Sequence, residues 1–120
     1  MSSFIHLHNH SDFTLLDSTQ SIDSILNRID DLSMDSVGLT EKENLFSMIP
    51  FYKKAKKKGI KPILGCEVNV CLQSYANNQL YKSHNKNLDS HHLLLLVTNQ
   101  IGYLNLIKLV SISYIEGFDF

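Results

Sequence analysis

The stretch that decides the fold is Phe4-Ile5-His6-Leu7-His8-Asn9-His10-Ser11-Asp12, a short apolar run with a histidine at every second position. If this run is a β-strand, its side chains alternate between two faces, so that His6, His8 and His10 point the same way. Neutral imidazoles gathered on one face are suited to binding a metal ion. A strand end that merely displays surface histidines would have the same spacing, so the spacing alone favours neither interpretation.

Length and composition set the outer limits. The chain has 120 residues, of which 43% are hydrophobic and 19% are charged. These values are typical of one small globular domain or of a part of a larger one. The formal net charge is −1, which argues against an overall field that would attract nucleic acid or an anionic membrane.

The cysteines and the apolar runs bear on the cellular compartment. If the two cysteines, Cys66 and Cys71, share one strand, their odd spacing places them on opposite faces, which argues against a disulfide between them. The first residues lack the basic, apolar and small-residue pattern of a signal peptide, so we expect none. The longest apolar run, Leu93 to Val97, is too short to span a membrane. We therefore expect reduced thiols and a cytoplasmic protein.

The first half of the chain predicts two strand–helix units. The strand at residues 4–12 precedes a helix that Ser21 caps. A second strand, Ser36 to Thr40, leads through a polar loop, Glu41 to Asn44, into a helix that Asn44 caps and Gly59 ends. The apolar face of the first helix is expected to contain Ile22, Ile25, Leu26 and Ile29. That of the second is expected to contain Leu45, Met48, Ile49, Tyr52 and Ala55, with Pro50 as an interruption or a restart.

The second half predicts further strands and a closing helix. Ile60 to Leu64 is expected to form a strand, and Glu67 to Leu72 either extends it or follows it after Gly65. An exposed loop, Gln73 to Ser90, follows. His91 to Val97 is a continuous apolar run, typical of a strand that is buried on both faces of a parallel sheet. The last helix, residues 102–117, carries Leu104, Ile107, Leu109, Val110 and Ile115.

This alternation of strands and helices predicts an α/β layer fold with parallel strands and right-handed crossovers. In such folds functional residues gather at the carboxyl ends of strands. His8 and His10 end the first strand, Glu41-Lys42 follows the second and Glu67 follows the third, so these side chains are expected at one rim. His92 opens its strand, and its position alone predicts the opposite end.

Each acidic candidate also has a purely structural interpretation. Asp17 would cap a turn, Glu41 would be a solvated loop residue, and Glu67 would lie at the edge of a strand. Glu67 is the least ordinary of them, because Gly65 allows another backbone to approach closely beside it.

Six segments, taken in order, resemble the N-terminal PHP domain (polymerase and histidinol phosphatase) of bacterial DNA polymerase III alpha subunits. They are His6 to Ser11 with Leu15-Leu16-Asp17, Thr40 to Phe46, Phe51 to Ala55, Gly59 to Glu67, His92-Leu93, and Gly102 to Leu106 with Tyr114 to Phe118. The last pair is more specific to the polymerases than to PHP phosphatases. The resemblance runs from Phe4 to Phe120.

The resemblance implies a β/α barrel of the PHP type, similar to a TIM barrel. Residues 1–120 would be its N-terminal part, with the remaining barrel and the polymerase domains absent. It also implies a metal-lined pocket, in which His6 lies outside the ligands. The residues that match pocket positions are His8, His10, Asp17, Glu67 and His92.

One motif departs from the family pattern. Metal-binding members carry Asp-His after the threonine, whereas this chain has Glu41-Lys42. A charged lysine has no lone pair for a metal, and its cation repels one. We therefore expect a degenerate pocket in which Lys42 pairs with Glu67 or Asp17.

The resemblance implies a parent protein that is a DNA-directed DNA polymerase, a nucleotidyltransferase that uses Mg²⁺ in DNA replication. Its partners would be DNA, a proofreading subunit and a sliding clamp, and this segment would hold none of its catalytic residues. Zn²⁺ and Mn²⁺ are the candidate ions for the pocket. Three hypotheses remain for the segment: a degenerate structural scaffold, a metal-dependent proofreading 3′–5′ exonuclease, or a free-standing PHP phosphoesterase. Lys42 favours the scaffold, whereas Glu67 and the His8/His10 pair indicate a pocket that is partly retained.

Overall fold

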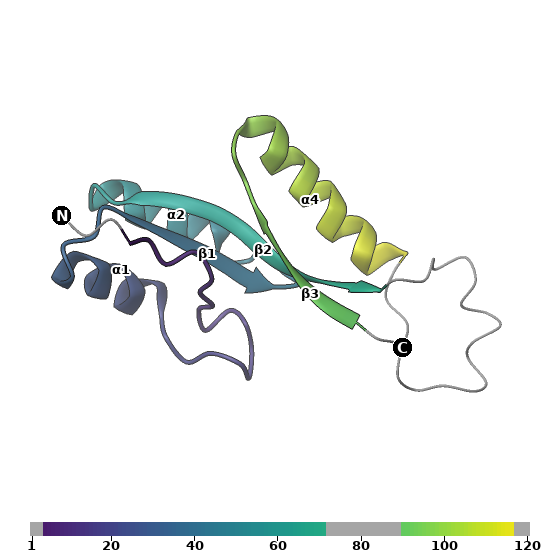
Figure 1. The fold of residues 1–120 in the computed structure, drawn as a ribbon, viewed down its shortest axis with the longest axis horizontal. Helices are drawn as coiled ribbons and strands as arrows, with labels where there is room; N and C mark the ends of the chain where they lie inside the picture. Colours follow the sequence, from purple (N-terminus) through teal and green to yellow (C-terminus); the bar gives the residue numbers. More distant parts are fainter. Residues whose placement is uncertain (1–3, 72–89, 117–120) are drawn as a thin grey trace.

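The computed structural model describes residues 4–71 and 90–116 (Figure 1). Its described part is a mixed α/β structure with one three-stranded sheet of order β1-β2-β3. In chain order the elements are α1 (Ile22–Asp31), β1 (Ser36–Lys42), α2 (Met48–Lys57), β2 (Lys61–Cys71), β3 (Ser90–Leu96) and α4 (Gln100–Ile115). No helix among these residues is long and apolar enough to cross a membrane.

The middle strand pairs with different neighbours along its two halves. Residues 61–67 of β2 pair in parallel with β1, and residues 65–71 pair antiparallel with β3. Of the two alternatives for the residues after Gly65, the structure shows extension of the same strand. The prediction of a wholly parallel sheet is wrong. An apolar run such as His91 to Val97 encodes burial and not direction. Its strand β3 is also less buried than expected, because Leu93 is 48% exposed and Leu96 is 37% exposed.

The histidine-rich segment is not a regular strand, contrary to expectation. It lies along the free edge of β1, where His6 O accepts from Gly38 N at 2.8 Å and Asn9 O accepts from Thr40 N at 2.9 Å. Between these two hydrogen bonds the N-terminal segment advances three residues, from His6 to Asn9, whereas β1 advances two, from Gly38 to Thr40. One extra residue on one side of a strand pair is the defining feature of a β-bulge. The Asn9 side chain bridges the irregularity by donating from Nδ2 to Gly38 O at 2.9 Å. The strict alternation of the three histidines is therefore broken.

The sheet has one face that the helices cover and one that the histidine segment approaches. Val37 and Leu39 of β1 pack against α1 and α2, while Cys66 of β2 packs against α4. Alternate residues must face the other way. Gly38 is one of these residues, and a Cβ added to it would lie 2.7 Å from the backbone oxygen of Leu7. The histidine segment therefore lies directly against this second face. The buried core around α1 consists of Ile22, Ile25, Leu26, Ile29, Val37, Leu39, Phe51, Ala55 and Ile60, which confirms the predicted face of that helix.

The ends of the first two helices follow local chemistry. Ser21 caps α1 as predicted, because its Oγ accepts from Ser24 N at 3.1 Å. Asn44 does not cap α2, which begins at Met48 after Ser47. Pro50 explains the late start, because a proline is tolerated in the first turn of a helix and not further in. Gly59 ends this segment with a φ of 76°, as predicted.

The apolar faces predicted for the last two helices are only partly correct. In α2, Met48 and Ala55 are buried but Ile49 and Tyr52 are exposed, and the fully buried Phe51 was not predicted. In α4, Val110 is buried as predicted together with Leu106. Leu104, Leu109 and Ile115 are exposed among the described residues. The loop predicted for residues 73–90 lies outside the described residues except for Ser90, which begins β3.

Gly65 provides a test of this packing. A Cβ at Gly65 would collide with the carbonyl oxygen of Leu95 and lie 2.8 Å from Thr40 Cγ2, and the β3 backbone cannot move away cheaply. We expect Gly65→Ala to lower the free energy of unfolding in urea by about 2 kcal/mol or more. Gly102→Ala is the control, because its nearest neighbour would be 3.7 Å away in a helix. It should be neutral or stabilising by about 0.5–1 kcal/mol. Equal effects of the two substitutions would contradict the close β2–β3 approach.

Candidate metal centre

Glu67 is the central residue of the candidate site. It lies on β2 in the short overlap where the strand has partners on both sides, Lys42 of β1 and Leu94 of β3. Its side chain points away from the helix-covered face that holds Cys66, because neighbouring residues of a strand alternate. Although it faces away from the helices, only 4% of the Glu67 side chain is exposed.

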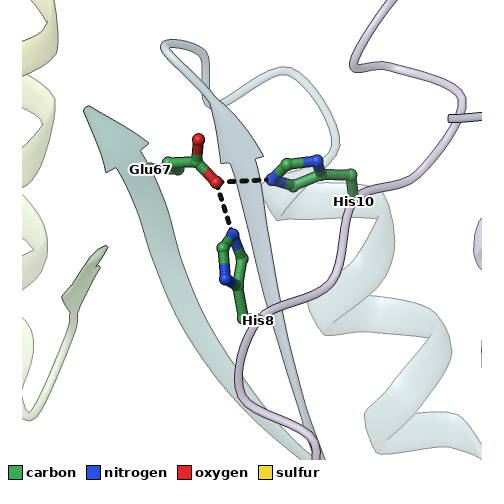
Figure 2. Close-up of side chains that lie close together, drawn as sticks. All are labelled: His8, His10 and Glu67. Atoms are coloured by element: carbon green, nitrogen blue, oxygen red, sulfur yellow. Dashed lines mark hydrogen bonds and ion pairs between the residues drawn. The ribbon is translucent and has the colours of Figure 1, made fainter. Parts of the chain in front are cut away.

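The N-terminal segment directs two imidazoles at this carboxylate (Figure 2). Nε2 of His8 contacts Glu67 Oε2, and Nε2 of His10 lies 3.0 Å from the same oxygen. The two rings meet edge to face with centroids 5.2 Å apart. The His10 side chain is 21% exposed, whereas that of His8 is 55% exposed. The bulged segment therefore still brings together the histidine pair that the sequence predicts.

A third imidazole reaches the carboxylate from the other side. His92 Nδ1 lies 3.0 Å from Glu67 Oε1. Position along the strand predicted that His92 would lie at the opposite end, and that prediction is wrong. Because β3 runs antiparallel, its first residues lie beside the last residues of β2, and His92 pairs with Asn69. The same-face alternation of an antiparallel pair then turns its ring toward Glu67.

These contacts set the ionisation of the site. Burial alone would raise the pKa of Glu67, but the hydrogen bond from His8 and the charge and hydrogen bond of His10 together lower it below its ordinary value. An ionised carboxylate only accepts hydrogen bonds, so the ring nitrogens that face it carry protons in this arrangement. The same nitrogens become metal ligands when they lose those protons.

The ligand atoms of His8, His10 and Glu67 all lie within 4.8 Å of one another. Two imidazole nitrogens and a carboxylate oxygen form a donor set that suits zinc or another divalent transition metal. The residues present therefore fit one divalent ion. His92 is not one of these three residues, but it contacts the other carboxylate oxygen of Glu67 and can therefore orient that carboxylate toward an ion.

Two other residues named from the sequence do not join this group. Asp17 is half exposed and pairs with Lys42, whose Nζ lies 3.4 Å from its Oδ2. This pairing was one of the two predicted for Lys42. His6 instead packs edge to face against Phe4, with ring centroids 4.8 Å apart, in agreement with its expected place outside the ligands.

Glu41 has a role that the sequence did not reveal. It was predicted to be a solvated loop residue, but it lies within β1 and is only 2% exposed. Its carboxylate accepts hydrogen bonds from Ser11, Thr14 and Ser47. No local pattern signals this arrangement, because two of the three donors are about thirty residues away in sequence.

Comparison with known proteins identifies the family of this chain. The PHP domain family model matches residues 6–120. The chain belongs to the PHP domain family. It is 48% identical to DNA polymerase III subunit alpha of Borreliella burgdorferi over 98% of the chain and 10% of that relative. It is 41% identical to the same subunit of Helicobacter pylori strain J99, over 97% of the chain and 9% of the relative. It is 37% identical to the Aquifex aeolicus subunit, over 96% of the chain and 10% of that relative.

The family match confirms the resemblance drawn from the motifs. This PHP chain spans about a tenth of the length of the relatives it matches. The described elements are consistent with part of a PHP domain, in which one sheet face is covered by helices and the other carries Glu67.

Cys66 lies next to Glu67 but on the opposite face, and it tests this division. It is a free, buried thiol, and burial raises its pKa from 9.0 to about 11. A raised pKa means that the protonated thiol stabilises the fold below pH 9 and that this contribution is lost as the pH rises from 9 to 11. At pH 8 the folded thiolate fraction should be about a hundredfold below that of an unfolded thiol.

We therefore expect Cys66 to react with a disulfide reagent at pH 8 at least about a hundredfold more slowly in the folded chain than in urea. A Cys71→Ser background makes Cys66 the only thiol in the chain. Fast labelling of the folded chain would contradict the placement of Cys66 against α4.

Proposed function

We propose that this chain is the N-terminal PHP part of a bacterial replicative DNA polymerase III alpha subunit. The family match, the polymerase-like closing helix and the identities to three such subunits support the proposal. The parent would be a Mg²⁺-dependent DNA-directed DNA polymerase of the cytoplasm. Its partners would be DNA, a proofreading subunit and a sliding clamp, and its polymerase carboxylates would lie outside this chain.

Within that parent we infer that the PHP pocket is a partly degenerate metal centre whose main role is structural. One observation carries this inference: Lys42 pairs with Asp17 at 3.4 Å. Asp17 is not part of the His8, His10 and Glu67 group. Lys42 is also the register partner of Glu67, so its cation replaces part of the positive charge that further metal ions would bring.

The retained residues have defined tasks in this proposal. His8, His10 and Glu67 would hold one divalent ion, and His92 would orient the Glu67 carboxylate through its other oxygen. When bound, such an ion would supply Lewis-acid chemistry toward a phosphate ester. Without it, the His8 and His10 ring nitrogens contact the Glu67 carboxylate directly, and these contacts hold the N-terminal segment against β2.

A metal-dependent phosphoesterase or proofreading exonuclease is the alternative, and the contact of His92 with Glu67 favours it. A structural scaffold does not require a third imidazole on this carboxylate. Metal binding and hydrolysis assays separate the two hypotheses.

Lys42→His is the most direct test of the degenerate centre. We expect weak zinc or manganese binding by the natural chain and an increase of at least about tenfold in affinity for Lys42→His, because a cation is exchanged for a neutral donor. Lys57→His, on the exposed side of α2, is the matched control and should change nothing. Titration calorimetry measures the affinities, and a phosphodiester substrate reports hydrolysis. Tight metal binding and DNA cleavage by the natural chain would overturn the structural role.

The two histidines of β3 provide a second test. His91 and His92 are adjacent and both exposed, but only His92 contacts Glu67. We expect His92→Ala to weaken metal binding about tenfold and His91→Ala to leave it unchanged. Equal losses would show that the effect comes from β3 as a whole and not from the His92 ring.

A further inference from the structure

Glu41 is the most deeply placed acidic side chain that the proposed function does not use. It is 2% exposed, and its three hydroxyl partners, Ser11, Thr14 and Ser47, are at most 3% exposed. A buried carboxylate is costly unless hydrogen bonds satisfy it. Within residues 4–71 and 90–116, the contacts found for the Glu41 carboxylate are hydrogen bonds from a backbone N–H and three hydroxyls.

The two oxygens of Glu41 accept from donors in two parts of the chain, the N-terminal segment and the residue before α2. Oε1 accepts from Ser11 Oγ and, at 2.7 Å, from Ser47 Oγ at the start of α2. Oε2 accepts from Thr14 Oγ1. The backbone N–H of Ser11 lies 3.1 Å from Oε2 and 3.2 Å from Oε1. Glu41 thus joins the N-terminal segment to β1 and α2.

The attachment at Ser11 immediately follows His10. On the other side of His10, Asn9 is fixed to β1 through its carbonyl, which accepts from Thr40 N, and through its side chain, which donates to Gly38 O. The backbone of His10 is therefore held on both sides. Its ring is the more buried of the two that approach Oε2 of Glu67.

We propose that Glu41 is a positioning residue that fixes Ser11 and Thr14 and thereby holds the His10 ring against Glu67. The metal-binding part of this proposal rests on the proposed function, but the effect on the ring does not. His92 is carried by β3 and, among the described residues, makes no direct contact with Glu41; it meets Glu67 at the other carboxylate oxygen, Oε1. Loss of the Glu41 contacts should therefore release His10 and leave His92 in place.

Glu41→Gln tests the proposal with little change in shape, because it replaces one acceptor oxygen by a donor. Ser47→Ala is the matched control. It removes one hydrogen bond from the same carboxylate but leaves Ser11 and Thr14 attached, and the Ser47 side chain makes no capping bond to α2. The full chain is labelled with ¹⁵N-histidine, and ring-nitrogen signals of His10 and His92 are recorded without metal.

We expect the His10 ring signals to shift or broaden in Glu41→Gln, with a smaller change at His92, which shares the Glu67 carboxylate, and neither to change in Ser47→Ala. Zinc affinity should fall at least about tenfold in Glu41→Gln and by less than about threefold in Ser47→Ala. Unchanged His10 signals in folded Glu41→Gln would overturn the proposal, as would equal changes at His10 and His92.

Two further outcomes are distinguishable. If the natural chain binds no zinc, the metal-centre proposal fails, while the ring signals still decide the role of Glu41. If Glu41→Gln does not fold by circular dichroism, Ser11→Ala removes a single hydroxyl donor and is used instead. The same selective change at His10 is then expected, and its absence would overturn the proposal.

Discussion

The structure depends on the short overlap in β2 where Gly65, Cys66 and Glu67 have strand partners on both sides. Parallel pairing with β1 and antiparallel pairing with β3 are both satisfied there, and Gly65 has no Cβ that would keep the β3 backbone away. This overlap places Glu67 between two strands, with its carboxylate on the face where the imidazoles of His8, His10 and His92 reach it. It also turns the beginning of β3 toward the same place, so that chain segments distant in sequence meet at one acid.

Local patterns were sufficient for much of the fold. Ser21, Gly59 and the apolar spacing of α1 act through neighbouring residues, so the sequence predicted them. Strand direction and the placement of Asp17 depend on which distant segments pair, and no local pattern contains that information. His92 shows the difference: its motif predicted a pocket residue, its position in the strand predicted the wrong end, and the antiparallel register decided the matter.

The two buried acidic residues of this region, Glu41 and Glu67, have different hydrogen-bond partners. Glu67 is satisfied by imidazoles, which can release protons, whereas Glu41 is satisfied by a backbone amide and hydroxyls, which cannot do so near neutral pH. The first arrangement can therefore exchange protons for a metal ion, and the second is permanent. The contacts of Glu41 with Ser11 and Thr14 do not involve Glu67, so they hold the N-terminal segment whether Glu67 binds imidazoles or an ion.

The same ring nitrogens cannot serve a proton and a metal at once, which makes the metal-free contacts competitors of the metal. Any ion that enters must displace the protons that His8 and His10 share with Glu67. The Glu67 pKa is lowered by those very contacts, so the competing arrangement is itself favourable. Lys42 and Asp17 are paired with each other as well, so an ion that used Asp17 would also have to compete with the Lys42 cation.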